Sequence, residues 1–312
     1  MRRAVTLATA ALMVGGIATA CGGVQRQSLI SGKSAAQVAS LGSDGLAQSS
    51  FRFTGTGKFG VDTSGLNGIP AATLQALQSA LSKVRDFSGS GEAESSHRIS
   101  EKGSIGGRQV YVTIYDGTFF SSLDATHWAS NDQFKQLFAS FDLSSSDIRN
   151  LVGQSSDITD LGPATVDGVQ TEHLHANLDQ SYLSKALDKV FGSTTTQYGS
   201  LLRAALPAVH LDRGSVDEWV DADAHIRRQA SDARISIDLG KLFAAIEQQL
   251  GQSLPPGQTL PSGTYAMTIQ ATVDYRDFGA KITLTKPTVD PNAPTLSQIF
   301  QTFGGGSSSA TP

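Results

Sequence analysis

The longest run of alternating apolar and polar positions spans residues 265–275, which read YAMTIQATVDY. A period of two predicts a β-strand, because successive side chains of a strand point to opposite faces. One apolar and one polar face are typical of an antiparallel sheet with one solvated side. At about 3.3 Å per residue this strand is roughly 36 Å long. That length favours a wide sheet that is twisted and curved.

The segment after this strand carries a turn signal at residues 276–279, which read RDFG. We expect residues 281–285 to return as the neighbouring strand. That strand would end before Pro287, because proline has no N–H to donate to a ladder.

Similar alternation predicts strands over much of the remaining chain. The pattern is clear at residues 51–61, where Gly55 and Gly57 allow a bend or a close backbone approach. Further strands are expected at 87–94, 97–100, 108–115, 118–121, 171–178, 215–220, 225–230 and 234–239.

Apolar residues at helical spacing predict helices between these strands. The first begins after Ser34, a favoured N-cap residue, and extends to residue 48, although Gly42 and Gly45 lower its helix propensity. The others are expected at 70–84, 132–141, 148–152, 182–206 and 241–250. Strands interleaved with amphipathic helices indicate an α+β fold, in which a large curved antiparallel β-sheet carries the helices on its concave face.

The first 20 residues have the pattern of an export signal. A short basic start precedes an apolar run that ends near Ile17, and small residues lead to Cys21. The apolar run of about 14 residues is short for a membrane span, so a retained helix is the weaker interpretation. Residues 18–22 resemble the lipobox of bacterial lipoproteins, in which the cysteine thiol takes a diacylglycerol. The alternative is an ordinary secretory signal with an incidental cysteine.

These segments predict the organisation of the chain. We expect a lipoprotein signal peptide at 1–20, a lipidated N-terminus and flexible tether at 21–33, one domain at 34–289 and a disordered tail at 290–312. Two acyl chains on Cys21 would hold the domain on the extracytoplasmic face of the membrane.

Charge excludes one class of partner. Without Arg2 and Arg3 the mature chain has 22 basic and 28 acidic side chains, a net charge of −6. No basic patch for nucleic acid is present in such a chain. Because Cys21 is the one cysteine, no disulfide forms within the chain.

The sequence carries no recognised catalytic motif and no phosphate-binding glycine loop, so we predict neither an enzyme nor a bound cofactor. His173 and His175 lie two apart on a predicted strand and would share a zinc ion if a third ligand joined them. Two histidines on the wet side of a strand are the simpler interpretation. Asp221 and Asp223 are calcium candidates, but they fall in a hairpin turn, where Asp is favoured for backbone hydrogen bonding. We therefore predict no metal site.

Large apolar side chains point to one side of several predicted strands. Periodicity alone does not distinguish a packed core from a ligand cavity. If a cavity is present, its lining is expected to include Phe51, Phe53, Phe59, Val110, Val112, Ile114, Met267, Ile269 and Val273.

Three segments, together with Cys21, give the chain a family resemblance. They are 166–178, 216–228 and 273–287, which contain VDGVQTEHLH, VDEWVD and VDYRDFG. In order and spacing they resemble the actinobacterial lipoproteins of the LppX/LprAFG family, whose fold is similar to the LolA and LolB lipoprotein carriers. The resemblance implies a half-barrel sheet around a hydrophobic cavity that holds the acyl chains of a lipid or glycolipid. The helices at 70–84 and 241–250 have no counterpart we recognise, and either would plug such a cavity or form its lid.

Two functions follow from the sequence. The first is a lipid-binding lipoprotein that transports or displays its ligand in the cell envelope. The alternative is a non-carrier lipoprotein of the same fold, a sensor or scaffold that binds an envelope protein.

Overall fold

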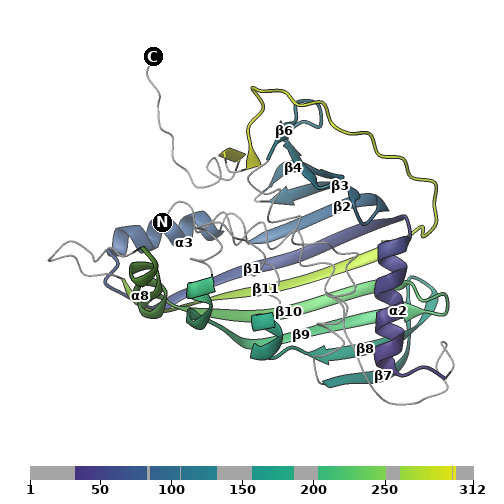
Figure 1. The fold of residues 1–312 in the computed structure, drawn as a ribbon, viewed down its shortest axis with the longest axis horizontal. Coiled ribbons are helices and arrows are strands. Elements are labelled where there is room, and N and C mark those ends of the chain that lie inside the picture. The colour runs from purple at the N-terminus through teal and green to yellow at the C-terminus, as the bar shows by residue number, and fades with distance from the viewer. Residues whose placement is uncertain are drawn as a thin grey trace.

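A computed structural model of the chain describes residues 32–82, 85–105, 107–131, 157–185, 203–250, 261–296 and 298–299. Within these residues, eleven strands form one antiparallel sheet in the order β6-β5-β4-β3-β2-β1-β11-β10-β9-β8-β7 (Figure 1). The sheet is open, since β6 and β7 are its two edges. The α+β prediction of a large curved antiparallel sheet is confirmed.

Two meanders make up the sheet. The first contains β1 (Phe51–Asn67), β2 (Asp86–Ser95), β3 (Arg98–Ile105), β4 (Arg108–Tyr115), β5 (Thr118–Ser122) and β6 (Ala129–Ser130). The second contains β7 (Asp157–Val166), β8 (Val169–Asn177), β9 (Val209–Asp221), β10 (Ile226–Asp238) and β11 (Ser262–Arg276). Pairing of β1 with β11 joins the first strand of one meander to the last strand of the other.

The strand expected at residues 265–275 is β11, which lies beside the central strand β1. The prediction for residues 281–285 is wrong, because these residues form no strand. The physical reason is that β1 and β10 already occupy both edges of β11, so no ladder position is left for a third neighbour.

Helix α2 (Ala35–Gln48) packs across one face of the sheet, which we call the inner face (Figure 1). Ser34 caps the helix as predicted, in a capping box with Gln37, whose backbone N–H donates to the Ser34 Oγ at 3.4 Å. A buried stripe along the helix consists of Ala35, Val38, Ala39, Gly42, Ser43 and Leu46. The helix needs a glycine at position 42, because an added Cβ there would lie 2.8 Å from the Ile226 Cγ1.

Helices α3 (Ala71–Ser82) and α8 (Leu239–Leu250) lie at the opposite end of the long strands from α2 (Figure 1). α3 follows β1 and contacts it, while α8 connects β10 to β11 and contacts the short helix η3 (Leu206–Ala208). Both helices were predicted from sequence, and their role as a plug or a lid stays a prediction.

Other differences concern the second meander. Strand β7 lies in a segment for which we predicted no strand. The segments 225–230 and 234–239 form one strand, β10, whose register with β9 shifts between Arg234 and Ile235. The predicted signal, Cys21, the helices at 132–141 and 148–152, and residues 186–202 of the helix at 182–206 lie outside the described residues.

Instead of a strand, residues 277–299 form a C-terminal strap that leaves β11 and ends beside β6 (Figure 1). Along its path the Leu284 N–H donates to Glu94 at 2.8 Å, and Val289 forms a parallel bridge with Trp128. The strap buries Ala293, Leu296 and Ile299. The ordered body thus continues past residue 289, and the disordered tail predicted from residue 290 begins too early; residues 300–312 lie outside the described residues.

Candidate functional site

The inner face carries all nine apolar residues that the sequence indicated. Strand register shows this, because residues directly opposite each other on paired strands share a face. Phe53 lies opposite Tyr275 on β11, and Phe59 lies opposite Ile269. In the other direction, the row from Phe53 continues through Gly91, Glu101 and Val112. The predicted set is Phe51, Phe53, Phe59, Val110, Val112, Ile114, Met267, Ile269 and Val273.

Part of this set belongs to the core beneath α2. The Phe51 ring packs edge-on against Tyr275, with 5.6 Å between ring centroids, and also contacts Phe278. With the α2 stripe and residues of β7–β10, Phe51 and Tyr275 form the main hydrophobic core. Phe51 therefore acts as a core residue, which is a more specific role than the sequence indicated.

The centre of the inner face is less covered. On β11, no residue between Ala266 and Tyr275 is fully buried, and Met267, Ile269 and Val273 are all half-buried. Phe53 and Ile114 are also half-buried. Central strands of a wide sheet are ordinarily the best covered part of a core. Phe53 and Val273 still pack against the core beneath α2, whereas Ile114, Met267 and Ile269 lie outside it.

Glycines make the inner face of β1 and β2 shallow, a feature that sequence reasoning missed. An added Cβ at Gly57 would overlap the Phe87 ring, and one at Gly91 would overlap the Phe53 ring. These rings therefore lie flat over backbone that has no side chain of its own. Gly57 was noticed in the sequence, but the ring that covers it comes from a different strand.

One carboxyl lies among these residues. Glu101 on β3 occupies the same inner-face row as Phe53, between Gly91 and Val112. Burial raises the pKa of the Glu101 carboxyl to about 7. Sequence reasoning missed Glu101. The signal was its spacing of two residues from Ile99, which places both side chains on the same, apolar side of β3.

A second polar group lies deeper, beneath α2. Glu218 and Gln229 are paired across β9 and β10, and the Gln229 Nε2 donates to the Glu218 Oε1 at 2.8 Å. Both side chains are at most 3% exposed. Burial, with a smaller contribution from Glu218, raises the pKa of Tyr275. This arrangement is consistent with a buried polar network that fixes the core.

His173 and His175 lie on the opposite, outer face. Both rings contact one oxygen of Asp217 on β9, the His173 Nε2 at 2.9 Å and the His175 Nδ1 at 3.0 Å. His173 also stacks on Trp219, with 4.2 Å between ring centroids. Asp217 is the third residue that a zinc site would need, but shared hydrogen bonds to its carboxylate explain both histidines without a metal.

Asp221 and Asp223 lie in the β9–β10 turn, as predicted. The ligand atoms of Asp221, Asp223 and His225 lie within 4.8 Å of one another, the geometry of a potential cation site. However, the Asp221 Oδ1 accepts the backbone N–H groups of Asp223 and His225, and its Oδ2 pairs with Arg227. The guanidinium already supplies the positive charge, so the turn interpretation is the better one.

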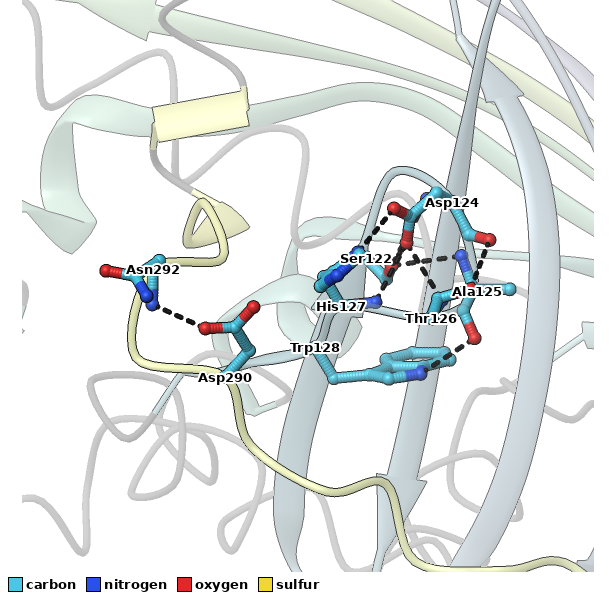
Figure 2. A network of polar contacts seen from close by, with 8 residues as sticks. All are labelled: Ser122, Asp124, Ala125, Thr126, His127, Trp128, Asp290 and Asn292. Carbon is cyan, nitrogen blue, oxygen red and sulfur yellow. Dashed lines mark hydrogen bonds and ion pairs between the residues drawn. The ribbon is translucent and has the colours of Figure 1, made fainter.

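A loop after β5 attaches the C-terminal strap (Figure 2). The Asp124 Oδ1 accepts the backbone N–H groups of Thr126 and His127 at 2.8 and 2.9 Å, and its Oδ2 contacts the His127 ring. These bonds lower the pKa of Asp124, and the carboxylate raises the pKa of His127. The carbonyl of Trp128 then accepts the Asp290 N–H at 2.8 Å. The network stabilises a loop and indicates no separate chemistry.

Within the described ranges, no helix has both the length and the apolar character needed to cross a membrane.

The fold and the inner face define an open antiparallel sheet with an incompletely covered apolar face. Similar solved structures include LprF from Mycobacterium bovis, 12% identical, covering 81% of this chain and 94% of LprF, with a TM-score of 0.38. Another is the lipoprotein LppX from Mycobacterium tuberculosis, 11% identical, covering 80% of this chain and 97% of LppX, with a TM-score of 0.36.

A LolA superfamily protein from Nitrosomonas europaea is also similar, at 8% identity and a TM-score of 0.25, covering 80% of this chain and 94% of its own. No family model matches the chain, and no curated protein is similar to it.

Proposed function

We propose that this chain is a lipoprotein, anchored through Cys21 to the extracytoplasmic face of the cell membrane, that binds a lipid or glycolipid for transport or display in the envelope. The inner face of the sheet receives the acyl chains, and no catalysis takes place. The residues that contact the ligand are the half-buried Phe53, Ile114, Met267, Ile269 and Val273. Phe59, Val110 and Val112 of the expected set are buried.

One observation carries this proposal: the large apolar side chains at the centre of the sheet are half-buried on the inner face. Leaving such side chains partly in water forfeits about 25 cal/mol per Å² of exposed apolar surface. A ligand with acyl chains would recover that free energy, which is why partly exposed apolar faces are typical of binding sites.

Native mass spectrometry with organic extraction tests the proposal. The full chain carrying Cys21→Ser, exported in a lipid-containing host, would lack its own acyl anchor. We expect mass in excess of the polypeptide, which extracts as acyl lipid. A clean polypeptide mass, without uptake of added lipid, would favour the scaffold function.

Ile269 gives a sharper test because its strand offers a matched control. In the same background, Ile269→Arg places a charge on the inner face, and we expect at least a tenfold loss of bound lipid, since an unpaired charge is costly on an apolar surface. Gln270→Arg puts the same side chain on the exposed outer face, one residue along β11. Equal lipid content in the two folded variants would refute the assignment of the inner face.

A further inference from the structure

The Glu101 carboxyl is a polar group of the inner face that lies outside the core beneath α2 and outside any turn, among glycines and apolar residues of β2–β4. Its strand, β3, is three strands away from β11, which is about 14 Å at about 4.8 Å per strand. Its row neighbours on β2 and β4 are Gly91 and Val112.

The side chain of Glu101 folds over a glycine on the neighbouring strand. An added Cβ at Gly89 would lie 2.3 Å from the Glu101 Oε1, and one at Gly103 would lie 3.8 Å from the same atom. Gly89 and Gly103 are opposite each other, and Gly55 on β1 continues their row. The carboxyl thus lies over a strip of backbone that has no side chains of its own.

No described residue forms a hydrogen bond or an ion pair with this carboxyl. The inner-face positions on the flanking strands are Gly89, Gly91, Ala93, Val110, Val112 and Ile114. Arg108 is also on the inner face of β4. It lies at the exposed start of the strand, two inner-face positions from Val112, the residue opposite Glu101. Lys102 is on the outer face, over the Tyr111 ring. No described residue therefore compensates for the partial burial of the Glu101 side chain.

We propose that Glu101 selects the ligand, by forming a hydrogen bond with the hydroxyl group of an uncharged lipid whose acyl chains lie on the inner face. This inference rests on the proposed function and adds the polar chemistry of its ligand. A carboxyl and a hydroxyl each donate and accept, so the pair satisfies both groups away from water. An anionic phosphate would instead be repelled by the carboxylate form.

The test compares two lipids that differ at one oxygen: dioleoylglycerol and its 3-O-methyl ether. Binding of each is measured by mass spectrometry on the full chain carrying Cys21→Ser, supplied with vesicles that contain the lipid. We expect at least tenfold more bound dioleoylglycerol than ether, because a site that pairs with a hydroxyl discriminates against an analogue without it.

Variants then assign the preference to one residue. Glu101→Leu should bind the two lipids equally, whereas Glu101→Gln, which keeps hydrogen-bonding groups, should retain a preference for dioleoylglycerol. Glu92→Leu is the matched control, since Glu92 lies on the outer face of the adjacent strand in an exposed pair with Arg52.

Two results distinguish a failure of the role of Glu101 from a failure of the proposed lipid binding. Equal binding of both lipids by the parent chain, or an unchanged preference in Glu101→Leu, would overturn the role of Glu101 while leaving lipid binding intact. Binding of neither lipid by the parent chain, together with a clean mass for the exported protein, would overturn the proposed function and this inference with it.

Discussion

Asp221 shows how one carboxylate organises the turn between β9 and β10. It is 2% exposed, accepts two backbone N–H groups and pairs with Arg227, while Ala224 in the same turn has a positive φ of 62°. Asp favours such turns because its side chain hydrogen-bonds the backbone two residues on. The residue type and its position in the hairpin were enough to predict this role.

Asp221→Asn keeps an acceptor for the backbone but leaves the Arg227 guanidinium without its counter-charge. We expect the free energy of unfolding to fall by about 2 kcal/mol, the scale of a charge-assisted hydrogen bond. Urea denaturation at pH 7 measures it. Asp223→Asn is the control, because Asp223 is exposed and its substitution should cost less than about 0.5 kcal/mol. Similar losses in both variants would contradict the assigned role of Asp221.

Glu101 should make stability depend on pH. Its carboxyl has a pKa of about 7 in the folded chain and an ordinary value of 4.5 when unfolded. Between these values the folded state binds more protons than the unfolded state, so the free energy of unfolding falls as pH rises and levels off above the folded pKa. The test is the difference in urea midpoint between the wild-type chain and Glu101→Gln. This difference should decrease as the pH is raised from 5 to 8. A flat difference would show that burial does not perturb this carboxyl.

At the scale of elements, the alternation of apolar and polar residues was sufficient to predict most of the long strands, and the helical spacing with the Ser34 cap was sufficient to predict α2. Strand β7 was missed because Gly162 and Pro163 interrupt its alternation, and its pairing with β8 compensates through a register shift between Asp160 and Gly162. β10 was predicted as two strands, but its register with β11 runs unbroken from Arg228 to Asp238, and the shift against β9 near Arg234 leaves its extra residue, Asp212, on β9. In both cases a neighbouring strand decided what local pattern left ambiguous.

Gly42 sets how closely α2 approaches the sheet. Gly42→Val should lower the free energy of unfolding by about 2 kcal/mol, because overpacking a close contact typically costs about 1–3 kcal/mol. Ser40→Val introduces the same side chain on the exposed face of the helix and should change stability by less than about 1 kcal/mol. Thermal or urea denaturation of the two variants measures the difference. A Gly42 variant as stable as the Ser40 variant would argue against close packing on Ile226.

At the scale of the whole molecule, the first and last strands of the described chain pair with each other. After α2 the chain forms one meander, then the second, and its last strand, β11, lies beside its first, β1. The strap from β11 then reaches the far edge of the first meander, where the Leu296 N–H donates to the Asn131 Oδ1 at 2.7 Å. The strap thus links the centre of the sheet to an edge that would otherwise be attached only through β5.

Leu296→Ala tests whether the strap belongs to the folded body. Leu296 is 1% exposed, so we expect a loss of about 2–4 kcal/mol in the free energy of unfolding. Val289→Ala, on the same strap, is the control, because Val289 is 49% exposed and should cost little. If both variants unfold at the same urea concentration, the strap is not part of the cooperative unit.

The sequence alone determined which segments alternate, where α2 begins and which apolar residues share a side, because these depend on backbone periodicity and local hydrogen bonding. Only the tertiary structure decided that β1 pairs with β11, that residues 281–285 continue as a strap, and that Glu101 lies over Gly89 on the inner face. These features join residues far apart in the chain. Strand order and contacts between strands do not alter the apolar–polar periodicity of either strand, so the sequence pattern does not reveal them.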